Sequence, residues 1–143
     1  MSGKAPILVA DDDPLVRELI LTRLRLAGFD VHGARDGREA VERARALRPQ
    51  AVVLDINMPE LDGFGVLAAL QELRLTPATP VLVLTARHAA EDVRKAIKLG
   101  AKDFLAKPFT QEQLMARVGR LLRTPIAPPP PRPQAPQPET VEI

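Results

Sequence analysis

The stretch VVLDINMPELDG, residues 52–63, places a carboxylate at the end of an apolar run. Residues 51–54 carry no polar side chain, a pattern typical of a strand that is buried on both faces of a parallel sheet. The run stops at Asp55, and Pro59 and Gly63 then turn the chain. The sequence therefore puts a charge where a buried strand ends, which raises the question of what that charge does.

Four further apolar runs alternate with stretches in which apolar residues recur at helical spacing. The predicted strands cover residues 7–10, 29–33, 51–54, 80–84 and 103–106, and the predicted helices cover residues 14–27, 36–47, 63–75, 90–100 and 110–122. Apolar strands separated by helices predict an α/β fold with a parallel sheet covered on both faces. Five units are too few for a closed eight-stranded barrel, so we expect an open, doubly wound (βα)5 sheet of flavodoxin type with strand order 2-1-3-4-5.

The folded domain is expected to cover residues 1–124. Residues 125–143 hold eight of the fifteen prolines, which predicts a flexible proline-rich tail or linker. Within the domain, the helix at 90–100 has a thin buried side, essentially Val93, Ala96 and Ile97. We therefore expect this helix to be loosely held.

Composition narrows the class of protein. The chain has 143 residues, 45% of them hydrophobic, which is enough for one core. It has no cysteine, which excludes thiolate metal sites and cysteine nucleophiles and favours the cytoplasm. No apolar span reaches 18 residues, so we expect no membrane contact. Aromatic residues make up 3% and opposite charges are interspersed, which argues against direct nucleic-acid binding.

Polar residues follow four of the predicted strands, and in a doubly wound sheet the carboxyl ends of the strands meet at one edge. The polar residues are Asp11, Asp12, Asp13, Asp55, Thr85 and Lys107, and Ala86 and Pro108 stand beside them at the ends of the fourth and fifth strands. Carboxylates brought together repel one another unless something positive lies among them. Hard oxygen ligands favour Mg²⁺ or Mn²⁺. A carboxylate nucleophile, a metal, the Lys107 ammonium and the Thr85 hydroxyl are the groups that phosphoryl transfer needs.

The motifs ILVADDD, LDINMPELDG, VLTA and GAKDFLAKPF stand in this order along the chain. With them the sequence resembles the receiver domain of two-component response regulators, over about residues 5 to 123. The resemblance implies that Asp55 is the phosphoacceptor. It implies that Asp12 and Asp55 ligate Mg²⁺ with the backbone carbonyl of Asn57, while Asp11 usually acts through water. It also implies an active-site Lys107 and a cis bond between Lys107 and Pro108.

The resemblance further implies a switch. The phosphoryl oxygens would engage Thr85, the Ala86 amide and Lys107, and Phe104 would rotate inward on the face formed by helix 90–100, strand 103–106 and helix 110–122. Because Phe lacks the hydroxyl of Tyr, we expect Phe104 to favour the inward pose. The expected donor is a sensor histidine kinase or a phosphotransfer protein, with acetyl phosphate as a slower route. The downstream effector is unknown from the sequence.

The last part of the domain looks most like receivers of winged-helix transcription factors, which dimerise on this face through charged pairs. Asp103 and Arg117 fit that pattern, whereas Lys98 and Gly119 depart from it. A homodimer formed on phosphorylation is therefore one expectation.

The alternative function is a Mg²⁺-dependent phosphohydrolase with a carboxylate nucleophile. Such enzymes place a second Asp two residues after the nucleophile as a general acid, but this chain has Asn57 there. We therefore expect slow self-dephosphorylation and no enzymatic turnover of outside substrates. A flavodoxin-type binding module is excluded by the acidic residues after the first strand, because they repel anions.

Overall fold

The structure of the protein, a computed structural model, describes residues 5–86 and 89–122. These residues form a five-stranded parallel sheet with strand order β2-β1-β3-β4-β5. In chain order the elements are β1 (Ile7–Ala10), α1 (Pro14–Leu26), β2 (Val31–Ala34), α2 (Gly37–Leu47), β3 (Ala51–Asp55), α3 (Gly63–Glu72), β4 (Val81–Ala86), α4 (Ala90–Lys98), β5 (Asp103–Lys107) and α5 (Gln111–Leu122). The predicted fold class and strand order are confirmed. The predicted tail, residues 125–143, lies outside the described residues.

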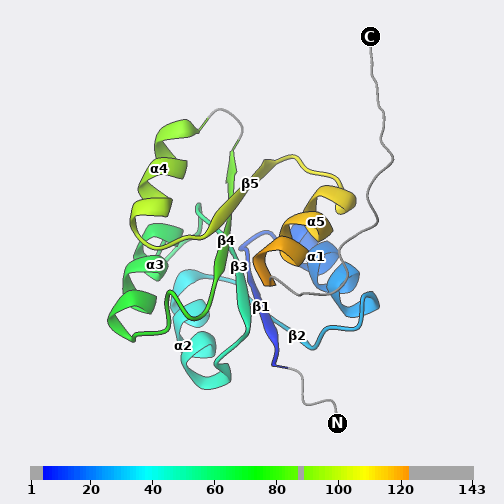
Figure 1. The fold of residues 1–143 in the computed structure, drawn as a ribbon, viewed down its shortest axis with the longest axis horizontal. Helices are drawn as coiled ribbons and strands as arrows, with labels where there is room; N and C mark the ends of the chain where they lie inside the picture. Colours follow the sequence, from blue (N-terminus) through cyan, green and yellow to red (C-terminus); the bar gives the residue numbers. More distant parts are fainter. Residues whose placement is uncertain (1–4, 87–88, 123–143) are drawn as a thin grey trace.

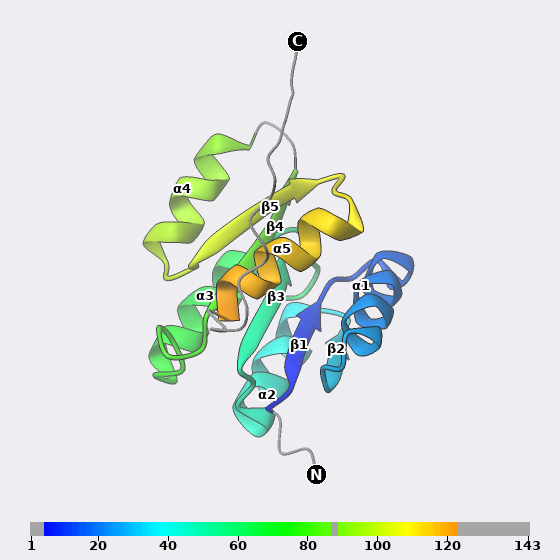
Figure 2. The ribbon, with the colours of Figure 1, turned by 45° about the vertical axis from the view of Figure 1, so that its right-hand side comes forward.

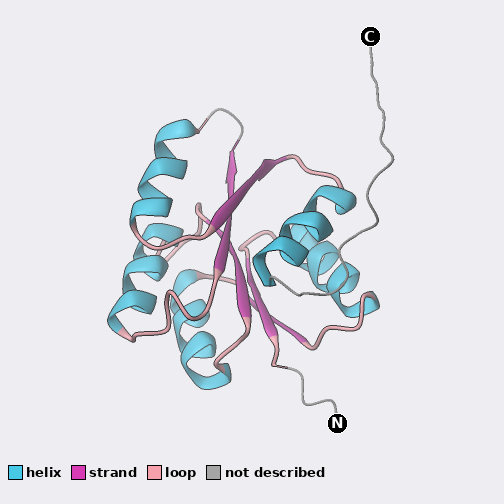
Figure 3. Cartoon of the chain, viewed as in Figure 1, coloured by secondary structure: helices cyan, strands magenta, loops and turns pink. Residues whose placement is uncertain are grey.

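The sheet is the middle of three layers. Helices α1 and α5 cover one face, and α2, α3 and α4 cover the other (Figures 1 and 2). Because side chains alternate along a strand, Ile7 and Val9 of β1 pack under α1 and α5, whereas Leu8 and Ala10 pack under α2 and α3. The three central strands are therefore apolar on both faces, as the uninterrupted runs predicted. The strands and the loops after them are distinguished by colour in Figure 3.

Side chains that cap the helices begin them where the sequence predicted. Asp13 accepts hydrogen bonds from the backbone N–H groups of Leu15 and Val16, and Pro14 occupies the first position of α1. Thr110 and Gln113 form a reciprocal capping box at the start of α5. These caps fix where each helix leaves the edge of the sheet that carries Asp55.

Every element except β1 differs from its predicted bounds by one to three residues at one end or both, and two of these differences have a clear cause at the end of a helix. Strand β2 starts at Val31 and not at Phe29, because the Phe29 N–H donates to the Leu24 carbonyl and completes the turn that follows α1. Helix α3 ends at Glu72 and not at residue 75. The chain turns at Arg74, whose φ of 62° lies in the left-handed region. In α3 the helix-like spacing of apolar residues continues past Glu72, which made the predicted helix too long.

Helix α4 has the fewest buried residues of the five helices in the described part of the chain. Ala96 is its buried residue, and Ile97, which we expected to be buried, is 45% exposed. Its N-cap residue, Ala89, makes no side-chain cap hydrogen bond. The expectation of a thin buried side is confirmed, and the side is thinner than the sequence suggested.

Gly63 is where the loop after β3 closes back onto that strand. Its N–H donates to the Ile56 carbonyl at 2.8 Å. A Cβ atom at this position would lie 2.6 Å from the Ile56 Cα and 2.9 Å from the Asp55 carbonyl oxygen. A side chain here would therefore push the loop off the end of β3 and move Asp55, which explains the glycine in the opening stretch.

No helix among the described residues combines the length and the apolar character needed to cross a membrane.

Candidate functional site

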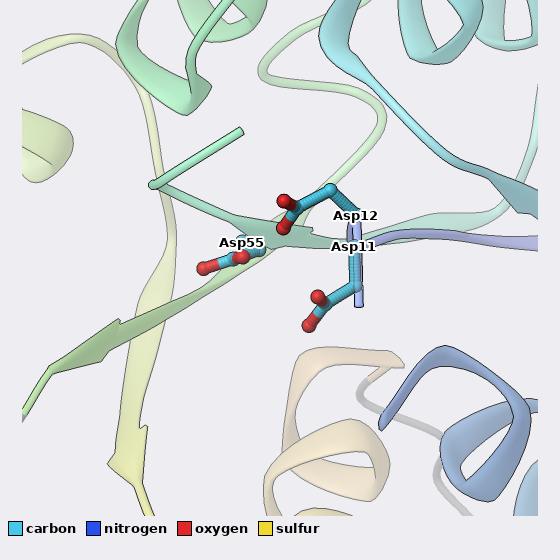
Figure 4. A group of neighbouring side chains, drawn as sticks. All are labelled: Asp11, Asp12 and Asp55. Carbon is cyan, nitrogen blue, oxygen red and sulfur yellow. The ribbon is translucent and has the colours of Figure 1, made fainter. Parts of the chain in front are cut away.

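Three carboxylates meet at the carboxyl ends of the neighbouring strands β1 and β3. Asp11 and Asp12 follow β1, and Asp55 is the last residue of β3 (Figure 4). One carboxylate oxygen from each of the three lies within 4.8 Å of the others. The edge of the sheet therefore brings together the acidic residues that the sequence singled out. Exposed acidic groups often gather without a metal, so the surroundings of each residue matter.

Asp11 is fully buried and both of its carboxylate oxygens are engaged. Its Oδ1 accepts a hydrogen bond from the Asp13 N–H at 3.0 Å, and its Oδ2 accepts one from Lys107 Nζ at 3.1 Å. Its backbone carbonyl accepts from Arg17 Nη1 at 2.7 Å. Asp12, in contrast, is exposed. The two acidic residues after β1 thus differ in how freely their oxygens can take a new partner.

Asp55 is 5% exposed and receives two contacts on the same oxygen. The Asn57 N–H donates to Oδ1 at 3.3 Å, and Lys107 Nζ lies 3.5 Å from Oδ1. Burial and the neighbouring Asp11 carboxylate raise the pKa of Asp55 to about 6, although Lys107 and the Asn57 N–H oppose that rise. The pKa of Asp55 is therefore raised mainly because its carboxylate is buried.

Lys107 is the last residue of β5 and contacts two of the three carboxylates. Burial alone would lower its pKa, but the Asp55 and Asp11 carboxylates outweigh burial and raise the pKa of the ammonium. The Lys107–Pro108 peptide bond is cis, as the resemblance implied. The oxygens of the clustered Asp11, Asp12 and Asp55 carboxylates suit a hard divalent cation. The donor set thus fits Mg²⁺ or Mn²⁺.

The predicted switch residues lie on the neighbouring strands. Thr85 is buried in β4 beside Ala106 of β5, and Ala86 is exposed and lies beside Lys107. Residues 87–88, which follow Ala86, lie outside the described residues. Thr85 and Ala86 therefore sit on the same edge as Asp55, at the end of the strand that pairs with β3.

Phe104 does not take the inward pose that we expected. It is 36% exposed, and the Arg117 guanidinium carbon lies 5.6 Å from the centre of its ring. The Arg117 Nη1 also donates to the Phe104 backbone carbonyl, and the same nitrogen lies 3.5 Å from Asp103 Oδ1. The Arg117 cation over the ring and its contact with the Phe104 carbonyl both favour the outward pose. The sequence argument considered only the hydroxyl that Phe lacks, and so predicted the inward pose.

Sequence reasoning missed three features of the site. It gave no role to Arg17, which donates to the Asp11 carbonyl, and it placed Arg117 in a dimer pair without expecting its contact with Phe104. It also missed a cavity of about 570 Å³ beside Asp55 that Leu19 of α1 helps to line. A signal for the cavity was present: Leu19, which lines it, is a leucine off the buried stripe of α1 and is 53% exposed.

Comparison with known proteins now identifies the family. A model of the response regulator receiver domain matches residues 7–119. The chain belongs to this family. It is a receiver domain of the kind used in two-component signalling, as the sequence motifs predicted.

Relatives and solved structures agree with this assignment. Transcriptional regulatory protein PrrA of Mycobacterium leprae is 47% identical over 117 residues, which cover 82% of this chain and 49% of PrrA. Chemotaxis protein CheY4 of Vibrio cholerae has a TM-score of 0.78 and 33% identity, and the match covers 83% of this receiver and 99% of CheY4. The chain spans about half the length of the curated relatives it matches.

A further solved structure bears on the metal. The receiver domain of a sensor histidine kinase from Pseudomonas aeruginosa has a TM-score of 0.77 and 29% identity, with coverage of 85% of this receiver and 100% of that domain. In that protein a magnesium ion is coordinated in the active site cleft. Receivers of this family typically bind Mg²⁺, and the Asp11, Asp12 and Asp55 cluster could hold a metal ion.

Proposed function

We propose that this receiver is a phosphorylation-activated switch of a two-component or phosphorelay system, and that it accepts the phosphoryl group on Asp55. The observation that carries the proposal is the environment of Asp55. It ends a central strand, 5% exposed, with two carboxylates and the Lys107 ammonium around it. A buried carboxylate with a raised pKa lowers the stability of the fold when it is ionised, and such groups cluster at functional sites.

The contacts of Asp55 suggest which of its oxygens attacks. The Asn57 N–H and Lys107 both contact Oδ1, so they hold the carboxylate in one orientation and leave Oδ2 turned away from them. In our proposal Oδ2 forms the new bond to phosphorus while the bond between phosphorus and the donor breaks. The donor's leaving group takes the bonding electron pair. Holding the nucleophile rigidly on a strand end supplies much of the rate.

The three carboxylates would hold Mg²⁺, and Mn²⁺ is an equivalent hard cation. Asp12 and Asp55 are the proposed direct ligands, together with the Asn57 carbonyl. Both oxygens of Asp11 already have partners, which supports an indirect role for Asp11 through water. When bound, the metal would neutralise charge on the phosphoryl oxygens.

Phosphorylation would then be read by the residues at the ends of β4 and β5. The new group adds negative charge and acceptor oxygens. In our proposal these oxygens engage Lys107, the Thr85 hydroxyl and the Ala86 N–H, which stand at the ends of the paired strands β4 and β5. Phe104 would leave its outward pose and change the α4-β5-α5 face. Moving a two-state equilibrium from 1:99 to 99:1 needs about 5.5 kcal/mol of differential contact, which several charge-assisted hydrogen bonds can supply.

The proposed donor is a sensor histidine kinase or a phosphotransfer protein, and the output is a partner or effector that reads the α4-β5-α5 face. PrrA is named a transcriptional regulator, so a DNA-binding effector elsewhere in a longer protein is one form of that output. Family members typically act as signalling switches, and we propose that this receiver turns over nothing beyond its own aspartyl phosphate. The phosphohydrolase alternative gains no support, because Asn57 cannot serve as a general acid. The cytoplasmic location stays a prediction.

The first test is covalent labelling. Incubation with acetyl phosphate and Mg²⁺ should add one phosphoryl group to the wild-type protein, as measured by intact-mass spectrometry, and none to Asp55→Asn. Asp62→Asn is the matched control, because Asp62 is also on the loop after β3 but caps α3 through its side chain. It should still be labelled. Equal labelling of wild type and Asp55→Asn would overturn the proposal.

A further inference from the structure

The cavity beside Asp55 has two kinds of wall. It has a volume of about 570 Å³ and lies between α1 and the first turn of α5. One end is polar and contains Asp55, Asn57 and Lys107, and the remainder is mostly apolar. A molecule in this cavity would therefore meet the acceptor carboxylate and an apolar surface at the same time.

The apolar surface is built from two helices that approach the site from the same side of the sheet. Val16, Leu19 and Ile20 come from α1, where their spacing places them on one face of the helix. Phe109 and Leu114 come from the segment that follows Lys107. Ile20 and Leu114 are buried and form the base, whereas Leu19 is 53% exposed and stands at the rim.

We propose that this cavity is a subsite for the leaving group of a small phosphodonor, and that it favours donors whose leaving group carries an apolar ring, such as an arylalkyl amine. The inference rests on the proposed role of Asp55 as acceptor and adds a class of substrate to it. A cavity of about 150 Å³ is enough to hold a benzene ring. The volume here leaves room for a ring together with a phosphoryl group.

The transfer balances for an N-arylalkyl phosphoramidate. The donor is a zwitterion whose nitrogen already carries the extra proton. The Asp55 carboxylate forms an O–P bond, the P–N bond breaks, and the nitrogen keeps its proton and takes the bonding electron pair. A neutral amine leaves through the apolar part of the cavity. An apolar, uncharged leaving group is what Leu19, Ile20 and Leu114 can accommodate.

The expected preference for a donor with an apolar leaving group is small, because the rim of the cavity at Leu19 is partly open to solvent. A small apolar group in a closed hydrophobic pocket is worth roughly tenfold or more in specificity. Because Leu19 is half-exposed, we expect the low end, about a tenfold faster labelling by N-benzylphosphoramidate than by unsubstituted phosphoramidate. The two donors also differ in intrinsic reactivity, so the variants below carry the test.

The decisive measurement is the ratio of the two labelling rates in Leu19→Gln and in Leu26→Gln. Both substitutions replace an exposed leucine of α1 with the same neutral helix-forming residue. Leu26 is 76% exposed at the far end of α1 and does not line the cavity. We expect the ratio to fall at least threefold in Leu19→Gln, within the roughly tenfold range of such pockets, and to keep its wild-type value in Leu26→Gln. Equal ratios in the two variants would overturn the inference.

Binding without transfer gives a second readout. With Mg²⁺ present, benzylphosphonate should shift the methyl NMR signals of Ile20 and Leu114, and methylphosphonate should not. Identical shifts from both compounds would count against the subsite. If acetyl phosphate fails to label wild type, Asp55 is not the acceptor and the inference falls with it. If acetyl phosphate labels Asp55 but the ratios do not differ between the variants, only the subsite is wrong.

Discussion

When Asp55 is ionised and no metal is bound, its buried charge lowers the free energy of unfolding. Its pKa is raised from 3.8 to about 6, so between those values the folded protein binds more protons than the unfolded chain. The protonated form therefore favours folding, and that contribution is present below about pH 4 and lost as the pH rises through 6. Above that pH the ionised Asp55 lowers the free energy of unfolding.

For the single residue Asp55, the test is the stability of Asp55→Asn in the presence of EDTA. At pH 7 the variant should be more stable than the wild type by about 2 kcal/mol, since it removes the buried charge. The difference should shrink towards zero as the pH is lowered from 7 to 4. Urea denaturation across that pH range measures both.

Asp30→Asn is the control for the loss of a charge. Asp30 is exposed, between α1 and β2, and lies 3.6 Å from His32 Nε2. Its substitution should leave the free energy of unfolding within about 0.5 kcal/mol of wild type at every pH. A pH-independent difference between Asp55→Asn and wild type would contradict the prediction.

At the scale of the elements, periodicity placed all five strands and all five helices of the described chain. It did so because buried strands and amphipathic helices carry different spacings of apolar residues. Two of the boundaries that differ depend on local backbone structure. Arg74 turns in the left-handed region without being glycine, and Phe29 serves as the end of a helical turn. No pattern of hydrophobicity encodes either.

Helix α4 depends on a contact that the sequence did not reveal. Lys95 Nζ lies 4.3 Å from the centre of the Phe64 ring on α3. Such a contact at a partly exposed site is worth about 0.5–1 kcal/mol, which matters for a helix whose buried residue is an alanine. Lys95→Met should therefore speed amide hydrogen exchange in α4 by roughly two- to fivefold.

Lys98→Met is the matched control for that prediction. Lys98 lies in the same last turn of α4 and is exposed, so its loss also removes a positive charge near the C-terminus of the helix. Hydrogen exchange followed by mass spectrometry should show a smaller change in α4 for this variant. If both variants change α4 equally, the Phe64 ring contributes nothing to holding the helix.

At the scale of the whole molecule, a cation at the site should stabilise the entire fold, because Asp11, Asp12 and Asp55 come together only when β1 and β3 pair. Mg²⁺ at ten times its dissociation constant should raise the free energy of unfolding by about 1.4 kcal/mol at pH 7. In Asp55→Asn the increase should be smaller. Thermal unfolding measures it, with NaCl at matched ionic strength as the reference. The same increase with NaCl would point to general screening.

The site was more predictable than its surroundings. The strand ends carry it, and parallel topology brings those ends to one edge whatever the loops do. The positions of Asp11, Asp12, Asp55 and Lys107 could therefore be predicted together. The pose of Phe104 and the cavity under Leu19 could not, because both depend on how α1 and α5 pack against the sheet. That packing is decided by side-chain shape, which spacing does not record.

The charged residues of β5 and α5 bear on any assembly of two receivers. Asp103 lies 3.5 Å from Arg117 and 3.1 Å from Arg120 of its own chain. A second molecule that binds this carboxylate would have to displace two guanidinium groups. Because these groups belong to the same chain, their local concentration beside Asp103 does not depend on the protein concentration. In a dimer through Asp103, a cation of the second molecule would therefore compete with Arg117 and Arg120 for the same carboxylate. A rearrangement that separates Phe104 from Arg117 would also weaken the contact between Arg117 and Asp103.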